Sequence, residues 1–493
     1  MRSYLKNNIL EVFTTLCEAN EVIKDLINKK DHVNAQNLMA DCQEIAIEIS
    51  DAIEESEGVG FVTASLLEEY CKSLYELLNS FSDEERCSCM VEQLEQTLDQ
   101  IGESLNNDIK VRREIVFFPY KASMWDSMDS IWKAASEDPS CDVYVVPIPY
   151  YDRNPDFSLG AFHYEGGNYP KYVPVVHYED YDIENRCPDV VYIHNPYDGY
   201  NYVTSVDPGF YSDELKKYTD LLVYVPYHIS GHFPGLASAP ASIAHGMSIA
   251  DMIIVQSENM KNYYAYGGVP ARKLAVLGSP KTDYTLNELN NAVIPSCWMD
   301  KLQGKKVILL NTSISDLLNS TNWSETISGL IGFFEESSEC VMIWRPHPLL
   351  RSTVASMRLD FLAEYDAIVA RMENSNNIIV DDTPSAYSAM KACDAMISDY
   401  SSLMMQLTLT GKPTLLMYGS EKDMSSVIVN FDFFGNYFVQ DGCTVGEFVQ
   451  MVINGQDEKR EERLRRAKSS IANTDGSCGA KIHEYVIKAI ECN

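Results

Sequence analysis

The pattern of apolar and polar positions divides the chain into a helical part and two series of alternating strands and helices. In the first 110 residues, apolar side chains recur every three or four positions, as in Leu66, Tyr70 and Leu74, which is the spacing of one helix face. Breaks fall near residues 29–31, 58–60 and 80–83. Ser82 followed by Glu85 predicts a capping box. We therefore expect an all-helical N-terminal domain, 1–110, of three or four antiparallel helices.

From Glu114 on, short apolar and β-branched runs alternate with helical stretches. The runs begin near residues 115, 143, 190, 221, 252 and 274, and again, after a polar linker, near 307, 341, 378, 395 and 414. Continuous apolar strands separated by helices are typical of parallel sheets covered on both faces. The predicted fold class is α/β, with two Rossmann-like doubly wound units over 111–285 and 305–455, followed by C-terminal helices over 456–493.

The net charge excludes more classes of function than the rest of the composition does. The 493 residues carry 72 acidic and 39 basic side chains, a formal net charge of −33. Such a chain repels nucleic-acid backbones and anionic lipid over most of its surface. General nucleic-acid binding is therefore excluded, and an anionic substrate must be held by a few local groups.

Cysteine usage and hydropathy indicate the compartment. The 13 cysteines include no CxxC pair, so the sequence signals neither a zinc site nor a disulfide framework. No signal peptide or long apolar segment is apparent. We expect a soluble, cytoplasmic protein with reduced thiols and no metal.

The strongest local motif lies between a predicted strand and a predicted helix, at residues 397–402. Ser398, Asp399, Ser401 and Ser402 place hydroxyls and free backbone N–H groups at the start of that helix. This combination suits the phosphates of a nucleotide diphosphate. The alternative is that Asp399 or Ser401 merely caps the helix.

A second motif, Arg345-Pro346-His347-Pro348, follows another buried strand. Arg345 supplies a permanent planar cation that suits a pyrophosphate. His347 stands between two prolines, which limit its backbone, so its imidazole could donate to a leaving phosphate or move a proton. The alternative is a structural histidine beside a surface arginine.

In the first α/β unit, histidines follow two predicted strands. His228 and His232 come after the strand near 221, and His194 comes after the strand near 190. Imidazoles at the carboxyl ends of strands fit a general base that faces a ligand cleft. Any one of them is also compatible with a structural role.

Taken together, these motifs resemble those of the CDP-glycerol glycerophosphotransferase family, which builds teichoic-acid and related glycerol-phosphate polymers in bacteria. The matching segments are Gly278-Ser279-Pro280-Lys281-Thr282-Asp283, Arg345-Pro346-His347-Pro348, Asp382 with Tyr387, and Ser398-Asp399-Tyr400-Ser401-Ser402 followed by Gly411-Lys412-Pro413. The resemblance covers roughly residues 111–455. This chain differs from the family pattern in having Ile229 in place of a glycine and Gln406 in place of an aspartate.

The resemblance implies a GT-B fold in which the C-terminal unit holds CDP-glycerol. It implies that a group of polar residues binds the donor diphosphate: Arg345, His347, Ser398, Ser401 and Ser402. Asp382, Asp399 and Lys281 are further donor-binding candidates in these motifs. His228 would deprotonate the acceptor hydroxyl, with His194 and His232 as further acceptor-side candidates.

The expected function is transfer of glycerophosphate from CDP-glycerol to a cell-wall or capsule polymer, without a metal or a separate cofactor. Two alternatives stay open, namely a GT-B glycosyltransferase with a nucleotide-sugar donor and a catalytically silent scaffold of envelope polymer assembly. The resemblance also implies a lipid-linked or polymer acceptor and a peripheral contact at the inner face of the cell membrane. The candidate membrane patch is the basic cluster of Lys459, Arg460, Arg463, Arg465, Arg466 and Lys468. The alternative is a solvated helix with ion pairs such as Glu461 to Arg465 and Glu462 to Arg466. The helical domain is a candidate for oligomerisation.

Overall fold

The computed structural model describes residues 1–154, 156–230, 236–320, 322–347, 350–383, 385–399, 401–418 and 436–491. The chain forms two compact units. The first comprises Met1–Ile115 with Asp138–Val143 and Ile183–Val190, and the second comprises Val116–Glu137, Tyr144–Asp182 and Val191–Asn493. We describe each by itself.

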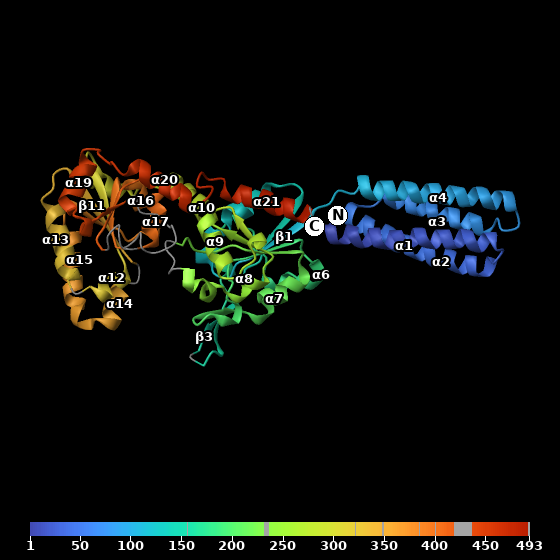
Figure 1. Cartoon of the computed structure of the whole chain (residues 1–493), viewed down its shortest axis with the longest axis horizontal. Coiled ribbons are helices and arrows are strands. Elements are labelled where there is room, and N and C mark those ends of the chain that lie inside the picture. Colours follow the sequence, from blue (N-terminus) through green and yellow to red (C-terminus); the bar gives the residue numbers. More distant parts are fainter. Residues whose placement is uncertain are drawn as a thin grey trace. The chain divides into compact units, whose positions relative to one another are not determined.

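The first unit contains four long helices (Figure 1). They are α1 Ser3–Asn28, α2 His32–Glu57, α3 Val62–Leu78 and α4 Glu84–Asn107. Consecutive helices pack against each other, and α1 also contacts α4. Leu16, Leu67 and Leu105 are fully buried between them, so the apolar spacing does form a core. The prediction that this region is all-helical is confirmed.

The start of α4 differs from the predicted capping box. Asp83 is the N-cap residue, and its Oδ1 accepts from the backbone N–H of Arg86 at 3.1 Å. An aspartate caps as well as a serine does and adds a negative charge at the positive end of the helix. The predicted position was therefore one residue early.

The first α/β sheet has the strand order β2-β1-β5-β7-β8-β9. Its strands are β1 Arg113–Phe118, β2 Cys141–Val145, β5 Val190–Ile193, β7 Leu221–Tyr224, β8 Met252–Val255 and β9 Leu274–Val276. β8 is parallel to both β7 and β9, and every residue of β5, β7 and β8 is buried. These are the apolar runs expected of a sheet covered on both faces.

A small antiparallel sheet was not predicted. It has the order β4-β3-β6, with β3 Tyr150–Arg153, β4 Leu159–His163 and β6 Thr204–Val206. Its strands are short and carry polar residues, such as Asp152 and Arg153, so they lack the apolar runs that identified the other strands.

The second α/β sheet has the order β12-β11-β10-β13-β14-β15, and each neighbouring pair is parallel. Its strands are β10 Lys306–Thr312, β11 Cys340–Pro346, β12 Ile378–Val380, β13 Ala395–Ser398, β14 Thr414–Leu416 and β15 Tyr437–Phe438. Helices α13 Trp323–Glu335, α15 Leu362–Glu373 and α19 Val445–Ile453 bury side chains such as Ile331, Met372 and Phe448 in the core that this sheet shares.

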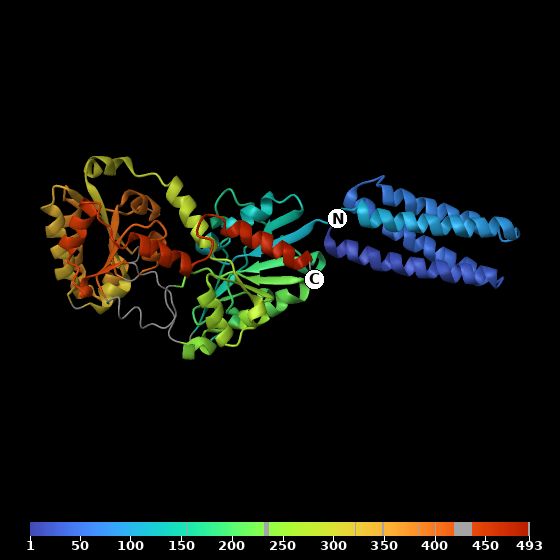
Figure 2. The same cartoon turned by 45° about the horizontal axis from the view of Figure 1, so that its top comes forward.

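The last helix, α21 Cys478–Glu491, packs on α5 Asp129–Glu137 beside the first sheet (Figures 1 and 2). The Asp283 carboxylate accepts from the backbone N–H of Gly479 at 2.8 Å and of Cys478 at 3.3 Å. Gly278 has a φ of 101°, and a Cβ there would lie 2.2 Å from the carbonyl oxygen of Ala472. The segment 278–283 therefore anchors the C-terminal part of the chain.

No helix among the described residues combines the length and the apolar character needed to cross a lipid bilayer.

Candidate functional site

The carboxyl ends of three neighbouring strands bring polar side chains together at one edge of the second sheet. Asn311 on β10 stands opposite Arg345 on β11 and opposite Ser398 on β13. Each of the three follows a buried apolar run, and strand ends at this edge are where open α/β sheets bind ligands. Two residues predicted from different motifs, Arg345 and Ser398, thus lie on strands adjacent to β10.

Arg345 is held by a buried aspartate. Its Nη1 donates to Asp381 Oδ2 at 2.8 Å and to the carbonyl oxygen of Thr383 at 2.9 Å. The Asp381 side chain is fully buried, whereas that of Arg345 is 11% exposed. Within the described part of the chain, Nε and Nη2 have no hydrogen-bond partner. The guanidinium is therefore fixed through one nitrogen and retains donors for an anion.

Asp382 is exposed, and its role on the donor side stays a prediction. Its neighbour Asp381, which the sequence analysis did not select, is the residue that contacts Arg345.

Asn311 organises two serines. Its Nδ2 donates to Ser398 Oγ at 3.0 Å and to Ser401 Oγ at 2.9 Å. The Ser398 hydroxyl donates in turn to the carbonyl oxygen of Asp399 at 2.6 Å. Ser401 is the N-cap residue of α17 Ser402–Thr408 but makes no side-chain cap bond, so its hydrogen is available to a ligand. The side chain of Ser402 lies outside what the structure describes.

Asp399 is a buried carboxylate with one unsatisfied oxygen. Its Oδ2 accepts from the backbone N–H of Ser313 at 2.6 Å, while the buried Oδ1 has no partner within the described residues. Burial raises the pKa of Asp399 to about 6, against the hydrogen bonds from Ser313. The carboxylate of Asp316, on α12 Ile314–Asn319, adds a like charge that raises this pKa further.

His347 directly follows β11 and is exposed. Its backbone N–H donates to the carbonyl oxygen of Thr312 at 3.1 Å, and its own carbonyl accepts from Leu350 at 2.8 Å. The backbone of this histidine is thus fixed at the same sheet edge as Asn311 and Arg345.

His228 and His194 both follow strands of the first sheet, but their burial and surroundings differ. His228 is half-buried and lines a small cavity with Gly278, Ser279 and Pro280. Burial lowers its pKa, and the charge of Lys281 lowers it further. The imidazole is therefore kept in its neutral, proton-accepting form.

Lys281 was predicted as a donor ligand. It forms an ion pair with Asp126 at 2.5 Å, and both side chains are more than four-fifths buried. The structure thus places Lys281 beside His228. No hydrogen bond or ion pair within the described part of the chain joins His228 or Lys281 to the group around Arg345.

His194 lies in the core of the first α/β region. It is fully buried, its Nε2 accepts from the backbone N–H of Tyr120 at 3.2 Å, and its Nδ1 lies 3.3 Å from Ser127 Oγ. Burial lowers its pKa to about 3. Because both ring nitrogens are engaged away from solvent, this geometry is that of a structural histidine. His232 lies outside the described residues.

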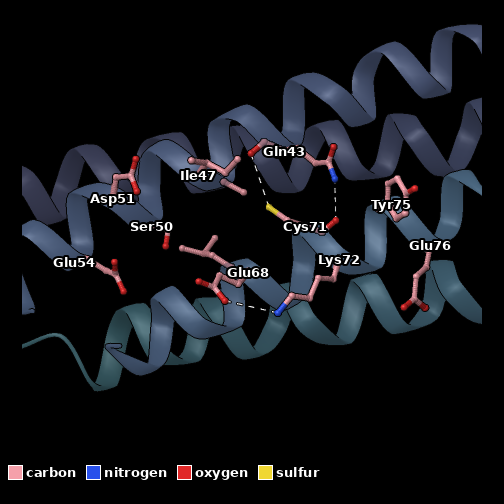
Figure 3. Close-up of a pocket in the computed structure, with 12 residues that line it drawn as sticks. Gln43, Ile47, Ser50, Asp51, Glu54, Glu68, Cys71, Lys72, Tyr75 and Glu76 are labelled. Atoms are coloured by element: carbon pink, nitrogen blue, oxygen red, sulfur yellow. Dashed lines mark hydrogen bonds and ion pairs between the residues drawn. The ribbon is translucent and has the colours of Figure 1, made fainter. Parts of the chain in front are cut away.

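The helical unit contains a separate hollow of about 560 Å³ between α2 and α3 (Figure 3). Apolar side chains such as Ile47 and Leu67 line it, and its acidic side chains are Asp51, Glu54, Glu68 and Glu76. Lys72 is its one basic lining residue and pairs with Glu68 at 3.7 Å. Four carboxylates against one paired lysine would repel a diphosphate, so this hollow is not a candidate donor site.

Comparison with known proteins identifies a family and a shared fold. The sequence pattern of a family described as CDP-glycerol:poly(glycerophosphate) glycerophosphotransferase matches residues 236–488. The curated proteins include no match to this chain.

Among solved structures, a UDP-N-acetylglucosamine 2-epimerase is similar over 78% of this chain and 98% of its own, with 12% identity and a TM-score of 0.51. The wall teichoic acid polymerase TagF is similar over 86% of this chain and 98% of its own, with 12% identity and a TM-score of 0.45. A UDP-GlcNAc 2-epimerase from Methanocaldococcus jannaschii gives 13% identity and a TM-score of 0.48, over 76% of this chain and 99% of its own. The first of these likenesses supports an α/β fold with parallel sheets.

Proposed function

Because the chain belongs to the CDP-glycerol:poly(glycerophosphate) glycerophosphotransferase family, we propose that the carboxyl edge of its second sheet binds the diphosphate of CDP-glycerol. The protein is a transferase that moves glycerophosphate from this donor to a cell-wall polymer. What we add is the assignment of residues to the two sides of that reaction.

The observation that carries the assignment is the group of hydrogen-bond donors near Asn311, at the carboxyl edge of the second sheet. Arg345, at the end of β11, has two nitrogens without a hydrogen-bond partner among the described residues, and Ser401, the N-cap residue of α17, has a hydroxyl that Asn311 holds. In a chain of net charge −33, such a cluster is what an anionic diphosphate requires, and charge-assisted bonds to guanidinium are among the strongest available. The α17 helix has only seven residues, so the side chains matter more here than its dipole.

Asp399 supports the same assignment, because it offers a hydrogen-bond acceptor to the substrate. Its buried Oδ1 has no partner in the described structure, and a buried acceptor without a donor is costly. The glycerol and ribose of CDP-glycerol both offer hydroxyl groups. We assign Asp399 to one of these hydroxyls.

For the chemical step, we assign His228 as the general base. The acceptor oxygen forms a bond to the phosphorus that carries glycerol, His228 takes the acceptor proton, and the bond from that phosphorus to CMP breaks. The lowered pKa of His228 suits a base that must be neutral before it acts. Arg345 and His347 stabilise the charge that develops on CMP. The reaction then needs neither a metal nor a separate cofactor.

The test is a binding series with CDP-glycerol, CDP, cytidine and UDP. Loss of Arg345 alone would leave the buried Asp381 carboxylate without its cation, so the informative variant is R345Q combined with D381N. We expect it to bind CDP and CDP-glycerol about 10- to 100-fold more weakly, from a loss of about 1.5–3 kcal/mol, and to bind cytidine unchanged.

Two controls accompany this test. D381N keeps the cation, and R351Q removes an exposed arginine that pairs with Asp366 at 2.9 Å. Equal losses for cytidine and CDP would place Arg345 away from the phosphates. A preference for UDP over CDP would favour a nucleotide-sugar donor instead.

We also propose that the protein acts in the cytoplasm, at the inner face of the cell membrane, on a lipid-linked or polymer acceptor. Three basic residues of helix α20 Arg460–Ser470 point to solvent, namely Arg460, Arg465 and Lys468, and these are the proposed contact. Oligomerisation through the helical unit stays a prediction that light scattering of the full chain would test.

A further inference from the structure

Three segments of the first α/β region converge on a group of metal-ligating side chains. They are η4 Asp198–Tyr200, α7 Ser212–Leu215 and α8 His245–Ile249, and α8 contacts both of the others. Asp198, Asp213 and His245 each offer one ligand atom, and these atoms lie within 4.8 Å of one another. We propose that the three residues bind a divalent first-row metal ion, Mn²⁺ or Zn²⁺, apart from the residues assigned to the transfer reaction.

The backbone holds two of the segments in close approach. A Cβ at Gly246 would lie 2.5 Å from Ser212 Oγ, so only glycine lets α8 come this near to α7. The N–H of Gly246 donates to the carbonyl oxygen of Pro196 at 2.8 Å. His245, the residue before this glycine, is thereby fixed next to the start of α7.

Asp198 is the anchor of the site. Its Oδ1 accepts from both the backbone N–H and the hydroxyl of Ser212, each at 3.0 Å. The residue has a φ of 49°, a left-handed conformation that aspartate tolerates better than most residues do. Because Ser212 is tied to Asp198, the next residue, Asp213, brings a second carboxylate to the same place.

An unsatisfied atom points independently to a ligand. Asp198 is 2% exposed, and its Oδ2 is buried without any partner among the described residues. Leaving a carboxylate oxygen buried and unpaired is unfavourable. A cation between the three residues would supply the missing interaction.

The distances between His245 and the two carboxylates also argue against a cluster that merely pairs charges. In the described structure, His245 forms neither a hydrogen bond nor an ion pair with Asp198 or Asp213. Its ring packs beside that of Tyr200, with centroids 5.2 Å apart. A histidine that served only to neutralise these carboxylates would close to hydrogen-bonding distance. Here the three ligand atoms lie within 4.8 Å of one another instead.

The donor set identifies the class of ion. Two carboxylate oxygens and one imidazole nitrogen suit Mn²⁺ or Zn²⁺, whereas Ca²⁺ takes six to eight oxygens. Asp213 is exposed, which gives an ion access from solvent and leaves room for water ligands. A bound ion would fasten η4, α7 and α8 to one another, so we assign it a structural role.

The test is a titration of the full chain with Mn²⁺, in which electron paramagnetic resonance measures the concentration of free Mn²⁺. Mn²⁺ is the probe because the 13 cysteines would also take up Zn²⁺, while Mn²⁺ prefers oxygen ligands. We expect one bound Mn²⁺ per chain, a rise in Tm on binding, and displacement by Zn²⁺.

Two variants and one control decide the assignment. D213N and H245Q should each weaken Mn²⁺ binding by at least about tenfold, and neither removes the Asp198–Ser212 contacts. H163Q is the control, because His163 also contacts an aspartate, Asp152, at 2.9 Å but lies outside the cluster. A chain that binds no Mn²⁺, or a D213N and an H245Q that bind it as the unchanged chain does, would overturn the proposal.

Discussion

At the scale of single residues, Asp399 has the clearest pH signature. Its pKa is about 6 in the folded chain because of burial, and about 3.9 in an unfolded chain. Between these values the folded state binds more protons, so the contribution of this group to stability falls as pH rises from about 4 to 6 and stays low above that. Two pKa units correspond to at most about 3 kcal/mol.

We therefore predict that D399N is more stable than the unchanged chain at pH 7.5 and has no advantage at pH 4. The expected gain is about 1–2 kcal/mol, since the amide that replaces the unpaired oxygen also lacks a partner. Urea unfolding at both pH values measures it. D366N is the control. Arg351 lowers the pKa of the Asp366 carboxyl, so the effect of this substitution on stability at pH 7.5 should have the opposite sign. Parallel stability curves for D399N and the unchanged chain would contradict the prediction.

Residue types were easier to predict than residue partners. Arg345 and Ser398 could be selected because a cation and a hydroxyl follow buried strands. Asp381 could not be told from Asp382, since adjacent residues at a strand end point in opposite directions and only the fold decides which one meets Arg345. Asn311 was missed because a neutral amide gives no charge signal, although it ends an apolar run as clearly as Arg345 does.

At the scale of elements, α20 shows why a basic cluster is not automatically a surface patch. Arg463 is fully buried, and its Nη2 donates to the carbonyl oxygen of Gly411 at 2.7 Å and pairs with Asp457. Arg466 pairs with Glu462 at 2.5 Å and is 15% exposed. Of the six basic residues in this cluster, Arg463 thus holds the helix in place, and Arg466 is engaged in a pair within the helix.

We predict that R463Q destabilises the chain by about 3–5 kcal/mol, because it leaves a carboxylate and a buried carbonyl without their partner. Differential scanning calorimetry should show a large fall in Tm. R465Q on the same helix is the matched control: Arg465 is 71% exposed and lies 3.9 Å from Glu462, so its loss should cost less than about 1 kcal/mol. Similar falls in Tm for the two variants would show that Arg463 is not an anchor.

The strands that were predicted and those that were missed differ mainly in how continuous their apolar runs are. Most strands of the two large sheets are apolar runs, since both faces of such a sheet are buried, whereas the missed edge strand β15 has only two residues. The strands of the small sheet β4-β3-β6 include exposed positions, such as Asp152 and Phe162. The pairing of β3 with β6 also joins residues more than 50 positions apart, such as Tyr150 and Val206. Local periodicity does not contain that information.

At the scale of the whole molecule, a net charge of −33 acts against any contact with anionic lipid. Attraction must come from a local patch, and each basic residue at a membrane surface adds about 1 kcal/mol. Arg463 is buried and Arg466 is largely buried, so the exposed basic residues of α20 are Arg460, Arg465 and Lys468. Two of these lie near carboxylates, with Arg460 at 3.6 Å from Glu461 and Arg465 at 3.9 Å from Glu462. Such a patch can support only weak binding.

We predict weak binding of the full chain to vesicles that contain an anionic lipid, at low salt only. Exposed charges are screened beyond a Debye length, which is about 30 Å at 0.01 M salt and 8 Å at 0.15 M. The double variant R465Q/K468Q should abolish the binding without unfolding the chain, because neither side chain is buried, whereas a variant that included Arg463 would confuse loss of binding with loss of fold. Cosedimentation with anionic and with neutral vesicles measures both effects. Binding that persists in R465Q/K468Q, or that is equal for neutral vesicles, would remove α20 as the membrane contact.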